Sequence, residues 1–128
     1  MNFSKQNDQT ISIVTKTEIH SVLLECILYI ECDGTLIKVF HADSDKPYYC
    51  TNTLKKLEAD LAEFGFIRII HNCLVNMKHV ACCKAKTHEI HLKNGLILPI
   101  SRQKWHKMKA LQSILFTTYF LITTTYVV

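Results

Sequence analysis

The alternation of hydrophobic and polar positions in the first third of the chain is typical of β-strands. Ile11–Thr15 alternates and is rich in β-branched residues, which predicts a strand. A longer apolar run over residues 22–31 predicts a buried strand that includes Ile27–Ile30. The Asp33-Gly34 pair is a turn signal, after which Thr35–Ala42 is expected to return as a second strand.

The periodicity changes near the middle of the chain. Asp43–Pro47 is expected to be a polar loop, followed by a short strand over Tyr48–Thr51. Apolar residues then recur at helical spacing, at Leu54, Leu57, Leu61 and Phe64. Asn52 or Thr53 can cap this helix, and Gly65 can end it in the left-handed conformation. The apolar stripe is interpreted as core.

The second half begins with Phe66–Asn76, an apolar stretch interrupted by two polar residues. It is expected to form a strand and a loop. Val80–Ile100 predicts a hairpin, because Asn94-Gly95 suits a type I′ turn. Pro99 lacks an N–H and therefore favours an edge position or a strand end. Ser101 can cap a final helix that extends to about Gln112, with three residues facing inward, Trp105, Met108 and Leu111.

The charges of this 128-residue chain are divided unevenly, although its net charge is only +4. Residues 1–63 carry six Lys or Arg and ten Asp or Glu, whereas residues 64–128 carry nine Lys or Arg and a single acid, Glu89. A half-chain this basic favours a polyanionic partner such as nucleic acid. The alternative is a solvated basic face.

The composition indicates one globular domain, because 48% of the residues are hydrophobic and 20% are charged. The polar start, residues 1–10, contains no secretory signal. The six cysteines form no C-x-x-C pair and are expected to be reduced, mostly buried thiols in the cytoplasm.

Metal, cofactor and enzyme chemistry are not expected. His88 and His91 lie three positions apart, which in a strand places them on opposite faces, and the adjacent Cys82 and Cys83 have the same difficulty. No nucleophile motif marks a catalytic cysteine. Three glycines in total cannot build a glycine-rich phosphate loop.

Two segments carry candidate nucleic-acid contacts. His71 and Asn72 interrupt an apolar run with side chains that can contact base edges, and Lys78 follows; the alternative is a loop whose polar groups satisfy local backbone. In the last helix, Arg102 and Lys104 place two cations in the first turn, where the helix dipole disfavours them.

A phosphate held by the N–H groups, the Ser101 hydroxyl and these cations would account for that arrangement, and Arg102 can alternatively reach a guanine edge. Lys107 extends the basic surface. The alternative is a tolerated surface arrangement. Asn76 is interpreted as structural, bonding the backbone of its own turn.

Three ordered segments give the chain its resemblance to the LytTR DNA-binding domain of bacterial transcription regulators. Residues 27–34, I-L-Y-I-E-C-D-G, resemble the early strand and turn of the family. T-L-K-K-L-E followed by F-I-R-I resembles its helix and strand. L-V-N at 74–76 and L-P-I-S-R at 98–102 resemble the later sequence motifs of the family. The resemblance covers roughly Ile11–Gln112.

This resemblance implies a mainly β protein with short helices, an elongated antiparallel β fold of LytTR type. It implies sequence-specific binding of double-stranded DNA for transcription regulation, through loops that contact the major groove at direct-repeat sites. Arg102 matches the family pattern and inherits a base or phosphate contact. Phosphate contacts are expected from Lys78, Lys104 and Lys107, base contacts from His71, Asn72 and Arg102, and a homodimer on DNA is an implied partner.

The central segment departs from the family pattern R-I-H-R-S-Y-L-V-N. Ile70 stands in the place of His and Cys73 in the place of the aromatic residue. His71 therefore occupies the DNA-facing position with a weaker, pH-dependent donor. Near Thr35, where the family often has a third contact, no basic residue occurs before Lys38.

Receiver domains often precede this module, and the chain has no room for one, so its regulation is expected from elsewhere. The division expected is a flexible N-terminus at 1–10, the DNA-binding domain at 11–112 and an apolar tail at 113–128. The uncharged tail, Ser113–Val128, is short for a membrane span. Packing, a separate regulatory or membrane partner, and aggregation remain alternatives for it. The alternative function is a protein-interaction or membrane-tethered module assembled through this tail.

Overall fold

The computed structural model describes residues 9–109 and divides the chain into two compact units. The first unit ends at Met77 and the second begins at Lys78. Every strand pair in the two units is antiparallel and the helices are short, which confirms the mainly β fold. The expectations for Leu111 and for Ser113–Val128 lie outside the described residues.

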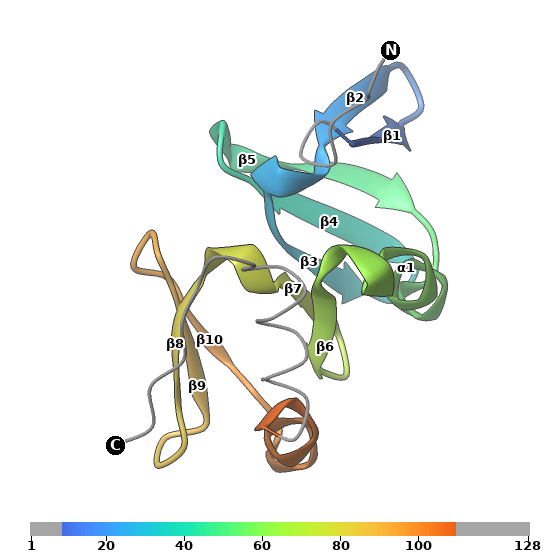
Figure 1. Ribbon diagram of the computed structural model, residues 1–128. Helices are drawn as coiled ribbons and strands as arrows, with labels where there is room; N and C mark the ends of the chain where they lie inside the picture. The colour runs from blue at the N-terminus through green and yellow to red at the C-terminus, as the bar shows by residue number, and fades with distance from the viewer. Residues whose placement is uncertain (1–8, 110–128) are drawn as a thin grey trace. The chain divides into compact units, whose positions relative to one another are not determined.

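The first unit contains two sheets (Figure 1). Strands β1 (Thr10–Val14) and β2 (Ile19–Leu23) pair in a small hairpin, which the short helix η2 (Leu24–Cys26) follows. The larger sheet has the order β5-β4-β3-β7-β6. Its strands are β3 (Ile27–Asp33), β4 (Leu36–His41), β5 (Ser44–Thr51), β6 (Phe66–Ile70) and β7 (Cys73–Asn76).

The apolar run over residues 22–31 is divided in the structure, because β2 ends at Leu23, η2 follows and β3 begins at Ile27. The buried strand expected over Ile27–Ile30 is part of β3. One sequence expectation for this unit is wrong. The polar loop expected over Asp43–Pro47 is strand instead, since β5 begins at Ser44 and only Ala42 and Asp43 form the turn. Pro47 is tolerated because β5 is the edge strand of the sheet, where a missing N–H breaks no central ladder.

The predicted helix is confirmed as α1 (Leu54–Leu61), continued by η3 (Ala62–Phe64). The hydroxyl of Thr53 accepts a hydrogen bond from the Lys56 amide at 3.3 Å, so Thr53 is the N-cap. Gly65 ends the segment with φ 89°, a conformation that costs glycine little. The apolar stripe joins a core that includes several fully buried strand residues, Ile27, Ile30, Ile37 and Leu74.

Strands β6 and β7 form a tight hairpin, which explains the apolar stretch broken by two polar residues. His71 and Asn72 are the turn between the strands. Asn76 at the end of β7 is almost fully buried, and its amide donates to the carbonyl oxygens of Leu24 at 3.3 Å and Ile27 at 2.9 Å. Its role is structural, as expected, but its partners are distant in sequence rather than local.

The second unit is a three-stranded sheet with the order β10-β9-β8, and a helix over residues 102–109 (Figure 1). The helix η4 (Met77–His79) leads into β8. The strands are β8 (Val80–Lys84), β9 (Glu89–Leu92) and β10 (Ile97–Pro99). Pro99 ends an edge strand, as predicted, but the region is a meander rather than a single hairpin.

The expected type I′ turn at Asn94-Gly95 is wrong. A type I′ turn needs positive φ at both central residues, and in this turn Gly95 alone has it, at 94°. The Gly95 amide donates to the Leu92 carbonyl at 3.0 Å, and the Leu92 amide donates to the Leu96 carbonyl at 2.8 Å. The connection therefore has an ordinary turn followed by a left-handed glycine, the pattern of a three-residue hairpin loop.

The thiols are less buried than expected. All six are free, but Cys73 alone is buried, Cys82 is exposed and the other four are half-buried. Burial raises the pKa of Cys73 to about 12, and burial followed by the neighbouring Cys82 raises the pKa of Cys83 to about 11. These two side chains therefore stay neutral thiols near pH 7.

Candidate nucleic-acid interface

The β6–β7 turn presents the two polar residues singled out in the sequence. The His71 side chain is exposed and Asn72 is half-buried. The Asn72 carbonyl accepts from the Cys32 amide at 2.9 Å, which extends the pairing of β7 with β3 by one residue. The turn backbone is thus anchored to the centre of the five-stranded sheet, and the His71 side chain remains accessible.

Arg68 holds the other side of this turn. Its Nε donates to the His71 carbonyl at 3.2 Å, and Nη2 donates to the same oxygen. Its Nη1 forms an ion pair with Glu58 of α1 at 3.3 Å. A guanidinium has a planar array of donors that can serve several acceptors at once. Arg68 therefore connects the turn to the helix of the same unit.

The start of the 102–109 helix has the predicted serine cap. The Ser101 hydroxyl accepts from the Lys104 amide at 3.1 Å, and the Ser101 carbonyl accepts from the Trp105 amide at 2.8 Å. Helix geometry gives the amides of Arg102 and Gln103 no acceptor within the helix. The first turn thus retains donors for an outside acceptor.

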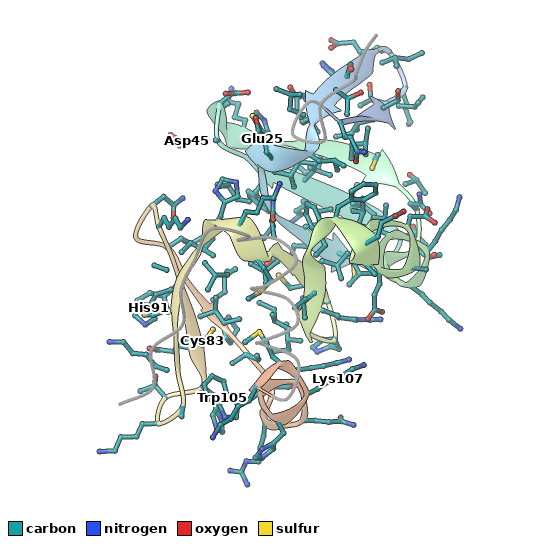
Figure 2. All side chains as sticks on the ribbon, viewed as in Figure 1. Glu25, Asp45, Cys83, His91, Trp105 and Lys107 are labelled. Carbon is teal, nitrogen blue, oxygen red and sulfur yellow. The ribbon has the colours of Figure 1, made fainter. Side chains whose placement is uncertain are left out.

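The helix distributes its cations over different faces. Arg102 and Lys107 are exposed, whereas Lys104 is half-buried beside the inward-facing Met108. Lys104 lies about 200° around the helix from Arg102 at about 100° per residue. Figure 2 shows Lys107 pointing away from the three-stranded sheet. The side chains of Arg102 and Lys104 therefore do not share a face in the way that the predicted phosphate seat requires.

Lys78 lies apart from these helix cations. It belongs to η4, where the neighbouring His79 carbonyl accepts from the Lys93 amide at 2.8 Å. This bond joins η4 to the end of β9 where the β9–β10 turn starts. The chain enters the 102–109 helix at the other end of the sheet, where the Ile100 amide donates to the His88 carbonyl at 2.9 Å. The start of β8 and the 102–109 helix thus lie at opposite ends of the three-stranded sheet (Figure 1), with Lys78 just before the first and Arg102 at the start of the second.

The boundary between the two units separates an acidic part of the chain from a basic part. Residues 1–77 contain seven Lys or Arg and ten Asp or Glu, whereas residues 78–128 contain eight Lys or Arg and only Glu89. The Glu89 carboxylate accepts from Thr87 at 3.0 Å and lies 3.2 Å from the His91 ring. The hydrogen bonds from Thr87 and then His91 lower the pKa of Glu89. The second unit is thus strongly basic.

His88 and His91 do not lie on opposite faces of one strand, contrary to the sequence prediction. His88 lies in the β8–β9 turn with φ 51°, not in a strand, so strand alternation does not apply to it. Within residues 9–109, no group of three His, Cys, Asp or Glu side chains is placed to hold a metal ion. This part of the chain also contains no helix long and apolar enough to cross a membrane.

The sequence matches the model of the LytTR DNA-binding domain family over residues 17–113. The chain belongs to the LytTR family. It is therefore a DNA-binding protein of transcription regulation, in a family of DNA-binding domains rather than of enzymes. No curated protein matches the chain.

A solved structure supports the LytTR fold independently. It is the LytTR DNA-binding domain of a protein described as a methyl-accepting/DNA response regulator from Bacillus cereus. The match has a TM-score of 0.68 at 20% sequence identity and covers 80% of this chain and 95% of that chain. At 20% sequence identity, this match shows a shared fold.

The LytTR motifs have clear structural roles in this chain. L-V-N lies in the buried strand β7, and L-P-I-S-R contains the end of β10 and the helix cap. The arginine of R-I is the residue that holds the His71 carbonyl. The contact of Arg68 with Glu58, ten residues earlier in the chain, leaves no local signal in the sequence.

Proposed function

We propose that this LytTR domain binds a specific double-stranded DNA sequence through two loops, the His71–Asn72 turn and the start of the 102–109 helix. The observation that carries the proposal is the exposed polar turn, whose backbone is fixed by Arg68 and by Cys32. A fixed backbone places side chains reproducibly, which sequence discrimination requires. The DNA-binding portion is proposed to extend over residues 11–112.

Base contacts are assigned to His71, Asn72 and Arg102, in the major groove. Arg102 is exposed and its planar guanidinium matches the O6 and N7 acceptors of guanine. Asn72 can pair with an adenine edge in the same manner, and His71 offers a single donor or acceptor. The substitution of Ile70 and Cys73 for the usual family residues supports a base preference particular to this chain.

Phosphate contacts are assigned to Lys107, Lys104 and Lys78. The exposure of Lys107 suits this role best, whereas Lys104 and Lys78 are half-buried and contribute through the ends of their side chains. Because Lys78 and Arg102 occupy opposite ends of the sheet, one duplex touching both would run along the second unit. Such contacts orient the protein without reading sequence.

The DNA sites are proposed to be direct repeats, occupied by two copies of the chain. A direct repeat relates the copies by translation along the duplex, so any contact between them is head-to-tail. A separate regulatory partner is proposed to act through Ser113–Val128. The alternative of a module assembled only through this tail is not favoured by the family match, which ends at residue 113.

Selection of bound duplexes from a random pool by the full chain tests the proposal. Enrichment of one motif is expected, with a preference over a scrambled duplex of at least about a thousandfold. The same duplex titrated between about 50 and 200 mM salt should show a steep loss of affinity, because phosphate contacts release counterions. A pool without an enriched motif, together with a flat salt response, would contradict sequence-specific DNA binding.

A further inference from the structure

The β8–β9 turn, residues 85–88, adds a basic surface beside the helix start. We propose that Lys86, supported by Lys84, forms a further phosphate contact on the same duplex that Arg102 engages. This inference rests on the proposed function and extends the interface to an element outside the two loops named above. Both lysines are exposed, at the tip of the turn and at the end of β8.

The turn is fixed to the segment that leads into the 102–109 helix. The His88 carbonyl accepts from the Ile100 amide at 2.9 Å. The ring centroids of His88 and Trp105 are 6.5 Å apart, with an angle of 29° between the ring planes. Figure 2 shows Trp105 on the side of the helix that is next to this turn. One bond and one ring contact therefore join the turn to the helix within a single unit.

These connections set an upper limit on the distance between the two cationic residues. Lys86 is two residues from His88, and Arg102 is two residues from Ile100. Two extended residues span at most about 7 Å, and paired backbones place Cα atoms about 5 Å apart. The Cα atoms of Lys86 and Arg102 are therefore at most about 20 Å apart, equal to about six base steps of a duplex. Both side chains can thus reach phosphates of one short site.

The surrounding charges favour an anion at Lys86. Lys84 is paired in register with Glu89, the one acid of residues 78–128. The Glu89 carboxylate is already engaged by Thr87 and His91. Within residues 9–109 the ion pairs do not include Lys86. Lys86 thus remains a cation at the exposed tip of a basic unit.

A phosphate suits this position better than a base edge. A lysine ammonium is a compact point charge on a flexible stem, which follows backbone phosphates but matches no base pair uniquely. Phosphates also repeat along each strand, so a contact from the turn needs no exact register. Lys86 is therefore expected to strengthen binding to every duplex and to leave the base preference unchanged.

The test measures full-chain binding to the selected duplex and a scrambled duplex by fluorescence anisotropy across a salt series. The variants are Lys86→Gln and Lys46→Gln, each of which removes one exposed cation. Lys46 is the matched control, because it lies in the first unit between Asp45 and Pro47 and close to Asp43. Lys86→Arg retains the charge and is the rescue variant.

Lys86→Gln should weaken binding about five- to tenfold at about 0.1 M salt, on both duplexes, and should reduce the salt slope by about 0.9. Lys46→Gln and Lys86→Arg should bind as the wild type does. Equal affinity and slope for Lys86→Gln and the wild type would overturn the inference, as would an equal loss in Lys46→Gln. Failure of the wild type to prefer the selected duplex would instead overturn the proposed function.

Discussion

Arg68 holds the carbonyl oxygen of His71 through two guanidinium donors, Nε at 3.2 Å and Nη2. Glu58 anchors the same guanidinium at 3.3 Å. The residue proposed to contact DNA is therefore fixed through its backbone, and its imidazole remains exposed. Arg68 is therefore expected to be a positioning residue, whose replacement should weaken DNA binding in a protein that still folds.

Replacing Arg68 with lysine should test whether Arg68 positions the His71 turn for DNA binding. Arg68→Lys keeps the charge but lacks the planar donors that reach both His71 and Glu58. The free energy of unfolding should fall by only about 1–2 kcal/mol, measured by urea denaturation. Affinity for the selected duplex should fall about tenfold or more. Without Arg68 the His71 turn is no longer held in place, and the loss of a base contact costs about 1–3 kcal/mol of binding free energy. Glu58→Gln, which leaves the bonds to His71 in place, should have a smaller effect; unchanged affinity in Arg68→Lys would contradict the positioning role.

Asn76 should be a major determinant of stability. Its side chain is 1% exposed and donates to the carbonyls of Leu24 and Ile27. Asn76→Ala leaves these two buried acceptors without their donor, at about 1–3 kcal/mol each. The free energy of unfolding should fall by about 2–4 kcal/mol in urea denaturation. Asn94→Ala, at an exposed turn, should cost less than about 1 kcal/mol, and an equally small loss in Asn76→Ala would count against this account.

Replacing His71 should weaken binding to the selected duplex, because its exposed ring is proposed to contact DNA. His71→Ala removes a hydrogen-bonding group from the turn, and the loss should be about 1 kcal/mol of binding free energy. His106→Ala, on the exposed side of the 102–109 helix, is the matched control and should bind as the wild type does. If anisotropy titrations give His71→Ala the wild-type affinity, His71 does not make the contact.

Alkylation should distinguish the cysteines by their environments. The pKa of Cys73 is raised to about 12 by burial, and the thiolate is the reactive form. At about pH 8 the folded protein should therefore be modified by iodoacetamide at the exposed Cys82 first, with Cys73 protected until urea unfolds the chain. Peptide mass spectrometry would locate the modified sites. Early modification of Cys73 in the folded protein would contradict its burial in the core.

The sequence predicted elements whose determinants are local. The helix over 54–64 followed from its apolar period, the cap at Thr53 and the end at Gly65, and the structure confirms all three. The sequence predicted only the second half of strand β5, because Pro47 and its polar neighbours resemble a loop. The strand order of the folded sheet is needed to show that they lie in an edge strand. The Asn94-Gly95 pair indicated the turn but not its type, since the turn type depends on the register of β9 with β10.

The candidate site could be predicted only in part. The motifs and their local context indicated His71, Asn72 and Arg102 as candidates, and these remain predictions. The contact of Arg68 with Glu58 and the attachment of the β8–β9 turn to Ile100 join residues that are ten or more positions apart. Pairings of this kind depend on how the strands assemble. For the same reason the sequence did not reveal that Lys78 and Arg102 lie at opposite ends of one sheet.

The most direct test of the account is the affinity of Arg102→Ala for the selected duplex, measured by anisotropy beside the wild type and Gln103→Ala. Arg102 and Gln103 are both exposed in the first turn of the helix, so the two variants alter neighbouring surface positions. Arg102→Ala should lose about 1–3 kcal/mol of specific binding and should tolerate base changes at the position that it reads. Wild-type affinity and base preference in Arg102→Ala would contradict the proposed interface.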